Sequence, residues 1–167
     1  PRGWDLARID KLGAIAGLRY REQDGALVFS AKREQKRALD ELPPPRRDLV
    51  ARYQDEYFFT IAGPMASIVT SRGCSFDCNF CAIWEFYERK TRFLSAKVMV
   101  DRMEAVPQKF IFFLDDNFLT NRRRLEEFCS EVERRGVEKY WGTQGRTDFI
   151  ADNPDLMKRL RYAGMVM

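Results

Sequence analysis

Three cysteines lie close together in the sequence, in the order Cys74-Ser-Phe-Asp-Cys78-Asn-Phe-Cys81. This C-x3-C-x2-C spacing brings three thiols to one short segment, and thiolates bind iron–sulfur clusters, zinc or Cu(I). A structural zinc site needs four protein ligands, usually cysteine or histidine. The sequence has no histidine, and its only other cysteine, Cys129, is far away in the chain. Three ligands therefore favour a [4Fe–4S] cluster with one iron left open for a small molecule.

An aromatic residue, Phe80, directly precedes the third cysteine. The cysteine spacing, this aromatic residue and the position after an expected strand resemble the radical S-adenosylmethionine (SAM) superfamily. In that family the open iron binds the amine and carboxylate of SAM, and an electron from the cluster cleaves SAM to a 5′-deoxyadenosyl radical. The resemblance implies that Cys74, Cys78 and Cys81 bind the cluster and that Phe80 contributes to cofactor binding. A zinc site completed by a carboxylate, and disulfides, are the alternatives.

The composition is that of an ordinary folded domain. The chain has 167 residues, of which 45% are hydrophobic and 32% charged, enough for one domain with a modest core. Its formal net charge of +4 is too small to predict a nucleic-acid partner without a patterned basic face. The longest clear apolar run, Phe110–Leu114, is far shorter than the roughly 20 residues of a membrane span. With free cysteines and no signal peptide, the sequence predicts a cytoplasmic protein without a transmembrane segment.

Residues 46–167 alternate between expected strands and expected helices. Apolar runs predict strands at Met65–Thr70, Phe110–Leu114 and Val137–Trp141, and the start of a fourth at Met165–Met167. Capping residues and helical spacing predict helices that begin after Ser95, end at Gly136 and begin at Asn153-Pro154. Such units form right-handed crossovers around a parallel sheet, so the fold class is α/β. The family resemblance makes these three βα units the N-terminal half of a partial radical SAM (β/α)6 barrel.

Polar side chains follow each of these strands. The cysteine loop follows the first strand, Asp115 and Asp116 follow the second, and Gln144 and Arg146 follow the third. Because ligands of parallel α/β folds bind at the carboxyl ends of the strands, we expect all of these side chains at one rim. Carboxylates bind ammonium groups and arginine binds carboxylates through two hydrogen bonds, and SAM carries both groups on its methionine end.

The resemblance places the SAM amine at the second strand, and therefore at Asp115 or Asp116. Gln144 and Arg146 are candidates for the SAM carboxylate or ribose. The alternative for all of these residues is ordinary turn chemistry at strand ends, in which Asp and Asn side chains accept hydrogen bonds from backbone N–H groups. No catalytic side chain is assigned, and the lack of histidine excludes His acid–base chemistry.

Residues 1–45 have a different pattern. Leu18–Glu22 and Ala26–Phe29 are expected to form a hairpin across a turn at Asp24-Gly25. The triple proline that ends at Pro45 joins neither a helix nor an interior strand, so it predicts a stiff linker. A hairpin, a linker and then the cysteine loop resemble cobalamin-binding radical SAM proteins. The resemblance implies that residues 1–45 are the tail of a cobalamin-binding domain plus the linker, and that this chain is a fragment.

Three segments resemble the hopanoid C-3 methylase branch of that group: Ser71–Cys81, Trp84–Phe93 and Phe113–Asn121. The resemblance implies cobalamin-dependent methylation of an unactivated carbon in a hopanoid-type lipid, by an enzyme of which this fragment alone is inactive. A small-molecule or lipid substrate and an electron donor are the expected partners, and a lipid would bring the enzyme to the membrane surface. Two alternatives are a cobalamin radical SAM enzyme that forms a ring or rearranges its substrate, and an iron–sulfur or zinc module without SAM chemistry.

Overall fold

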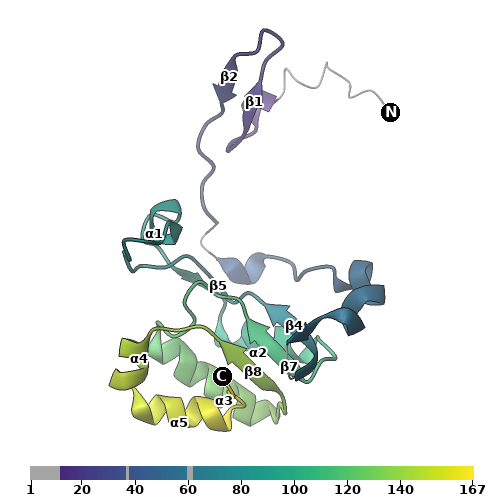
Figure 1. The fold of residues 1–167 in the computed structure, drawn as a ribbon, viewed down its shortest axis with the longest axis vertical. Coiled ribbons are helices and arrows are strands. Elements are labelled where there is room, and N and C mark those ends of the chain that lie inside the picture. Colours follow the sequence, from purple (N-terminus) through teal and green to yellow (C-terminus); the bar gives the residue numbers. More distant parts are fainter. Residues whose placement is uncertain (1–11, 37, 60–61) are drawn as a thin grey trace. The chain divides into compact units, whose positions relative to one another are not determined.

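A computed structural model describes residues 12–36, 38–59 and 62–167 (Figure 1). The chain divides into two compact units, Pro1–Arg37 and Ala38–Met167. In the first unit, β1 (Arg19–Arg21) and β2 (Leu27–Phe29) pair antiparallel and confirm the predicted hairpin. Gly25 has a φ of 86°, which is why the turn needs glycine. The origin of this hairpin in a cobalamin-binding domain stays a prediction.

The second unit contains a four-stranded sheet in the order β3-β4-β7-β8. The strands are β3 (Phe58–Phe59), β4 (Ala62–Ile68), β7 (Phe110–Phe113) and β8 (Tyr140–Thr143). The last three strands are parallel, whereas β3 runs antiparallel to β4. Ala66, Ile111 and Trp141 lie side by side in this register and are all buried, so one face of the sheet forms the core.

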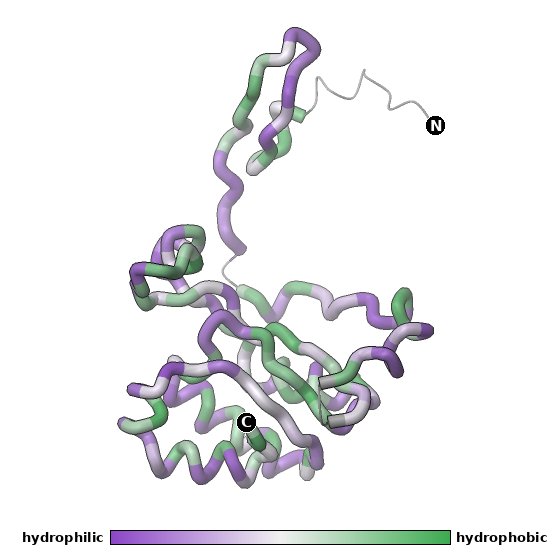
Figure 2. Tube along the Cα trace, in the orientation of Figure 1, coloured by the Kyte–Doolittle hydropathy of each residue, from purple (hydrophilic) through white to green (hydrophobic). Residues whose placement is uncertain are grey.

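Three longer helices cover that face: α2 (Ala96–Glu104), α3 (Arg122–Arg135) and α5 (Pro154–Tyr162). Ser95 caps α2 by accepting a hydrogen bond from Val98 N, and Gly136 ends α3 in the left-handed conformation with a φ of 62°. Both helix boundaries confirm the sequence prediction. Figure 2 shows the matching hydropathy pattern, in which α3 and α5 alternate between hydrophilic and hydrophobic residues. None of the helices in the described ranges is long and apolar enough to cross a bilayer.

Two details differ from the sequence prediction. β8 begins at Tyr140 instead of Val137, because Val137 N still donates to Val132 O and completes the end of α3. A short helix, α4 (Thr147–Asp152), was not predicted, and it directly precedes α5. Asn153 therefore ends one helix and begins the next, and its side chain donates to Phe149 O instead of capping α5. Met165 forms an isolated parallel bridge to Trp141, at the place expected for a fourth strand.

The segment before the sheet packs against α2. It contains the 3-10 helices η2 (Leu39–Glu41) and η3 (Arg47–Glu56). Leu39 is buried, Asp40 accepts a hydrogen bond from Ser95 N at 2.8 Å, and Leu42 O accepts one from Arg102 at 3.1 Å. These contacts lie within the second compact unit, which begins at Ala38, and the boundary between domains at residue 45 stays a prediction.

Candidate active site

The three parallel strands end side by side. Ile68, Phe113 and Thr143 are register partners at the carboxyl ends of β4, β7 and β8. The residues that follow them therefore leave the sheet at the same edge. This edge brings together the start of the cysteine loop, the pair Asp115-Asp116 and the segment Gln144–Arg146. The sequence predicted that these residues share one rim, and the strand register puts them there.

The cysteine loop lies between β5 (Ser71–Arg72) and α1 (Ile83–Phe86). Cys74, Cys78 and Cys81 are free thiols, and each is partly buried. The backbone folds tightly at the second cysteine, where Cys78 O accepts hydrogen bonds from Cys81 N at 3.0 Å and from the indole Nε1 of Trp84 at 3.2 Å. Arg146 Nη1, from the segment after β8, lies 3.6 Å from Cys78 Sγ. The segments that follow β4 and β8 therefore come close to each other at the thiol of Cys78.

A glycine and an aspartate fix the backbone just before Cys74. Gly73 has a φ of 93°, and a Cβ atom there would lie 2.2 Å from Lys90 O, so no other residue fits without a shift. Gly73 N donates to Asp116 Oδ2 at 2.9 Å. In addition, β5 pairs with β6 (Arg92–Phe93), which closes the far end of the loop. Asp116 therefore positions the first cysteine of the triplet.

Asp115 belongs to a buried hydrogen-bond network. Its two carboxylate oxygens accept from Thr70 N at 2.6 Å and from Thr70 Oγ1 at 2.5 Å. Arg124, near the start of α3, donates to Thr70 Oγ1 at 2.6 Å and to Leu94 O at 3.1 Å. Burial lowers the pKa of Arg124 to about 10, with Asp115 opposing the shift, so the guanidinium is charged at neutral pH. The network joins the ends of β4 and β7 to α3.

The two aspartates therefore differ in what they offer a ligand. Asp115 is 3% exposed and both of its oxygens are occupied by Thr70. Asp116 is exposed, and its described hydrogen bond to Gly73 occupies one oxygen. Of the pair, Asp116 is the carboxylate that an ammonium group can reach. Which of the two binds the SAM amine stays a prediction.

The remaining predicted cofactor residues are accessible. Phe80 is 89% exposed, and Gln144 is exposed while its main-chain oxygen accepts a hydrogen bond from Phe118 N. The guanidinium of Arg146 stacks 4.0 Å from the ring centroid of Phe76 and pairs with Asp148 at 2.7 Å. The Asp148 hydrogen bond raises the pKa of Arg146 above its usual value. Arg146 is held in place beside the cysteine loop, and its role in SAM binding stays a prediction.

The sequence did not identify Thr70, Gly73 or Arg124 as residues of the site. For Arg124 it does contain a signal, because this residue is one of three arginines in the first turn of a helix, where positive charge opposes the helix dipole. In the structure, the exposed Arg122 pairs with Glu126 and Asp155, whereas Arg124 points inward to Thr70. A sequence pattern alone does not tell an outward arginine from an inward one.

The three thiols provide the kind of donor set that iron–sulfur clusters use, because such clusters are held by cysteine thiolates. In residues 12–36, 38–59 and 62–167, no three Cys, Asp or Glu side chains are grouped closely enough to hold one ion. The donor set is three sulfurs on one partly exposed loop, which is what a [4Fe–4S] cluster with one open iron requires.

The pattern that defines the radical SAM superfamily matches residues 68–167, and the chain belongs to that superfamily. The chain is 32% identical over 121 residues to the hopanoid C-3 methylase of Methylococcus capsulatus, covering 72% of this chain and 23% of that protein. It is 27% identical over 157 residues to the anaerobic magnesium-protoporphyrin IX monomethyl ester cyclase of Rubrivivax gelatinosus, covering 91% of this chain and 28% of that protein. The chain thus spans about a quarter of the length of these relatives.

A solved structure has the same fold. The cobalamin-dependent S-adenosylmethionine radical enzyme OxsB superimposes with a TM-score of 0.71 at 16% identity, over 96% of this chain and 25% of that one. The likeness confirms the predicted fold class, a mixed α/β unit that matches part of a radical SAM fold. Membership of the superfamily implies a [4Fe–4S] cluster and SAM as cofactors.

Proposed function

We propose that this chain is the cluster-binding and SAM-binding part of an enzyme that methylates a hopanoid-type lipid in a cobalamin-dependent reaction. The observation that carries the proposal is the cysteine loop at the carboxyl end of β4, within the segment that matches the radical SAM superfamily. The similarity to a hopanoid C-3 methylase supports methyl transfer and a lipid substrate. The fold shared with a cobalamin-dependent enzyme, and the hairpin of the first unit, support cobalamin as a further cofactor.

Each part of the rim has a role in this proposal. Cys74, Cys78 and Cys81 would hold the cluster, which when bound supplies the electron that cleaves SAM. Asp116 accepts hydrogen bonds from the SAM ammonium group while it keeps Gly73 in place. Arg146 would donate to the SAM carboxylate through Nη1, because its Nε and Nη2 groups already donate to Asp148.

The other rim residues shape the site. Gln144 is exposed beside Arg146 and donates to the ribose, and the exposed Phe80 covers the bound cofactor. Asp115 keeps its structural contacts with Thr70. A radical route needs no histidine for proton transfer, which agrees with a sequence that has none.

The proposal extends to the partners of the enzyme. Reductive cleavage of SAM requires an electron donor, which we take to be a separate reducing protein. A hopanoid-type substrate resides in a lipid bilayer, so the enzyme would work in the cytoplasm at the membrane surface. No nucleic-acid partner is proposed, since the net charge of +4 is small for a chain of this length.

A second candidate is a cobalamin radical SAM reaction that closes a ring without transferring a methyl group. The observation in its favour is the similarity to the anaerobic cyclase, which extends over 91% of this chain against 72% for the methylase. Both candidates share the cysteine loop and SAM cleavage. They differ in the fate of the SAM methyl group, which can be followed directly.

The test uses the full-length protein, reconstituted anaerobically with iron, sulfide and cobalamin. The protein is incubated with a reductant, SAM labelled with deuterium in its methyl group, and membrane lipids of the host. We expect 5′-deoxyadenosine and a lipid that carries the labelled methyl group, both lost in Cys78→Ala. Formation of 5′-deoxyadenosine with no labelled lipid would exclude methylation of these lipids and leave the radical chemistry standing. Deletion of the gene, followed by lipid profiling, checks the substrate in the host.

A further inference from the structure

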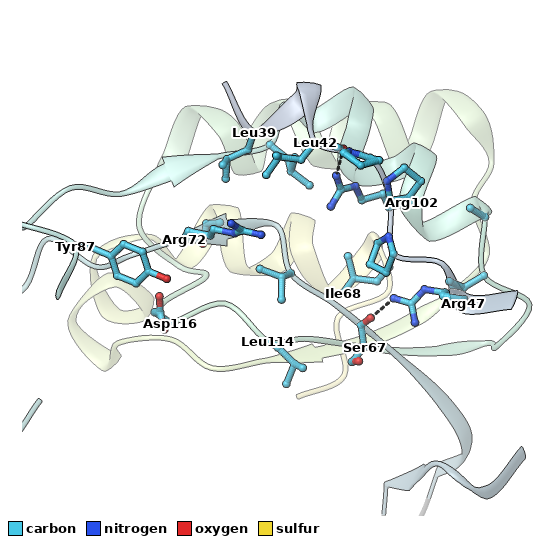
Figure 3. A pocket seen from close by; sticks show the side chains of 18 residues that line it. Leu39, Leu42, Arg47, Ser67, Ile68, Arg72, Tyr87, Arg102, Leu114 and Asp116 are labelled. Carbon is cyan, nitrogen blue, oxygen red and sulfur yellow. Dashed lines mark hydrogen bonds between the residues drawn. The ribbon is translucent and has the colours of Figure 1, made fainter. Parts of the chain in front are cut away.

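A cavity of about 700 Å³ lies in the second unit, beside the carboxyl end of β4. Its size is within the range of small-molecule sites, roughly 300–1,000 Å³. The walls come from the proline-rich segment, the end of β4, the last turn of α2 and the residues that follow β7 (Figure 3). None of the three cysteines of the triplet lines it.

Three arginines line the cavity: Arg47, Arg72 and Arg102. Figure 3 shows their side chains around the central space. Asp116, at one end, is the lining residue with a carboxylate, so three positive charges and one negative charge give the lining a formal charge of +2. Within the described part of the chain, no ion pair joins any of the three guanidinium groups to a carboxylate.

Two of the arginines are held in place without being neutralised. Arg47 donates to the main-chain oxygen of Ser67, and Arg102 donates to Leu42 O at 3.1 Å. Carbonyl oxygens carry no net charge, and each guanidinium has five N–H donors, so further donors remain on both. The side chains are therefore oriented in advance, which lowers the entropy lost when they bind a ligand.

The arginines are near enough to affect one another. Burial lowers the pKa of Arg102 below its usual value, the nearby carboxylate of Asp40 opposes this shift, and Arg72 and Arg47 lower the pKa further. An anion placed among the three guanidinium groups would reduce their mutual repulsion, and a phosphate group matches both their charge and their hydrogen-bond geometry.

The other walls of the cavity are apolar. They are formed by leucine, isoleucine, valine and proline side chains, including Leu39, Leu42, Leu94, Val106 and Leu114. Leu114 is 52% exposed although it lines this space, so its side chain is available for contact. A ligand that is only an inorganic anion would leave these walls uncovered. The walls fit a molecule with one charged end and one apolar part.

We propose that this cavity binds the phosphate group of an amphiphilic molecule between Arg47, Arg72 and Arg102, with the apolar part of the ligand against the leucine side chains. The three arginines are not among the residues that we assign to the cluster or to SAM, and Asp116, at one end of the cavity, is the residue that the two sites share. The ligand is either a phospholipid or a soluble phosphate ester, which share this chemistry.

The test is calorimetric titration of the full-length protein, purified anaerobically with its cluster, with hexyl phosphate. We expect inorganic phosphate to bind roughly tenfold more weakly or worse, because it buries no methylene groups. Arg72→Gln and Arg102→Gln should each weaken hexyl phosphate binding by roughly 10-fold to 100-fold, the range for a hydrogen bond between charged groups. Arg123→Gln is the matched control, because that arginine side chain is 89% exposed on α3, and it should bind like the wild type.

Circular dichroism of each variant checks that it is folded. Unchanged affinity in both cavity variants would overturn the proposal, and so would equal affinity for hexyl phosphate and inorganic phosphate. Sedimentation with phosphatidylcholine vesicles that contain phosphatidic acid distinguishes the two sources. Vesicle binding that is lost in Arg72→Gln assigns the site to a phospholipid. Hexyl phosphate binding without vesicle binding assigns it to a soluble ester.

Discussion

At the scale of single residues, the four cysteines occupy two kinds of environment. Cys74, Cys78 and Cys81 are partly exposed on a loop, whereas Cys129 is buried on the inner face of α3. Burial raises the pKa of Cys129 to about 11, so it stays a neutral thiol at neutral pH. Only the thiolate form binds metal, so Cys129 is not a metal ligand but a small apolar residue of the core. The three cysteines of the loop are the potential ligands.

We therefore predict different outcomes for the four Cys→Ala changes. Replacement of Cys74, Cys78 or Cys81 should abolish the [4Fe–4S] cluster, because a cluster with one open iron needs all three of these thiolate ligands. Cys129→Ala should keep the full iron content after anaerobic reconstitution, measured by iron and sulfide analysis and by electron paramagnetic resonance. Loss of the cluster in Cys129→Ala would contradict the assignment of three ligands.

The buried network around Arg124 leads to a second prediction. In Arg124→Met the carboxylate of Asp115 loses its nearby positive charge, and Thr70 Oγ1 loses a donor. Breaking a buried charge network costs about 3–5 kcal/mol of unfolding free energy. Urea denaturation of the full-length protein measures the loss. Arg123→Met is the control, since its exposed pair with Glu127 contributes at most about 0.5 kcal/mol. Equal stability of the two variants would show that the network is not stabilising.

At the scale of elements, the loop between β5 and α1 depends on one backbone conformation. We predict that Gly73→Ala distorts this loop, because the new Cβ would lie 2.2 Å from Lys90 O. The left-handed backbone alone costs about 1–2 kcal/mol for a residue with a side chain. Lower cluster content after reconstitution is the expected result. Gly63→Ala is the control, since a Cβ there meets nothing within 4 Å. Equal iron content in the two variants would refute the prediction.

The contact between α3 and α5 should depend on pH. The hydrogen bond from Arg122 lowers the pKa of Asp155 from 3.8 to about 2. A carboxyl group with a lowered pKa in the folded state stabilises that state above pH 4, and the effect disappears as the pH falls to about 2. We predict that Asp155→Asn is less stable than the wild type at pH 6 and equally stable near pH 2. Urea denaturation at both pH values measures this difference.

The Arg122→Gln background provides the control for that comparison. Without the guanidinium, Asp155→Asn should make a smaller pH-dependent difference, because the largest cause of the lowered pKa is gone and only the backbone hydrogen bonds at the start of α5 remain. A pH-dependent difference of the same size in this background would show that Arg122 is not its main cause.

The sequence predicts an element well where local residues determine its boundary, and poorly where a contact with a distant segment determines it. The helix boundaries at Ser95 and Gly136 follow from local backbone chemistry, and both are confirmed. The start of β8 is set by its register against Phe110, a contact between distant segments that a local pattern does not contain. For the same reason the sequence identifies Asp115 and Asp116 as a pair but does not show that Thr70 occupies one of them.

At the scale of the whole molecule, the helices cover one face of the sheet and the other face is largely open. Side chains alternate along each strand, so residues next to the buried Ile68, Phe113 and Trp141 point away from the helices. Val69, Leu114 and Tyr140 are such residues, and they are 43%, 52% and 60% exposed. The chain spans only about a quarter of the length of its relatives.

We therefore predict that residues 1–167, expressed alone, form oligomers or aggregates. Exposed apolar side chains on a sheet face, together with unpaired strand edges, promote association between copies. Size-exclusion chromatography with light scattering should show species well above the monomer mass of 19.6 kDa. The double variant Val69→Lys/Leu114→Lys should raise the monomer fraction, because it puts charge on the open face without changing the helix side. A monodisperse wild-type fragment of monomer mass that melts cooperatively would show that this face is not a site of self-association.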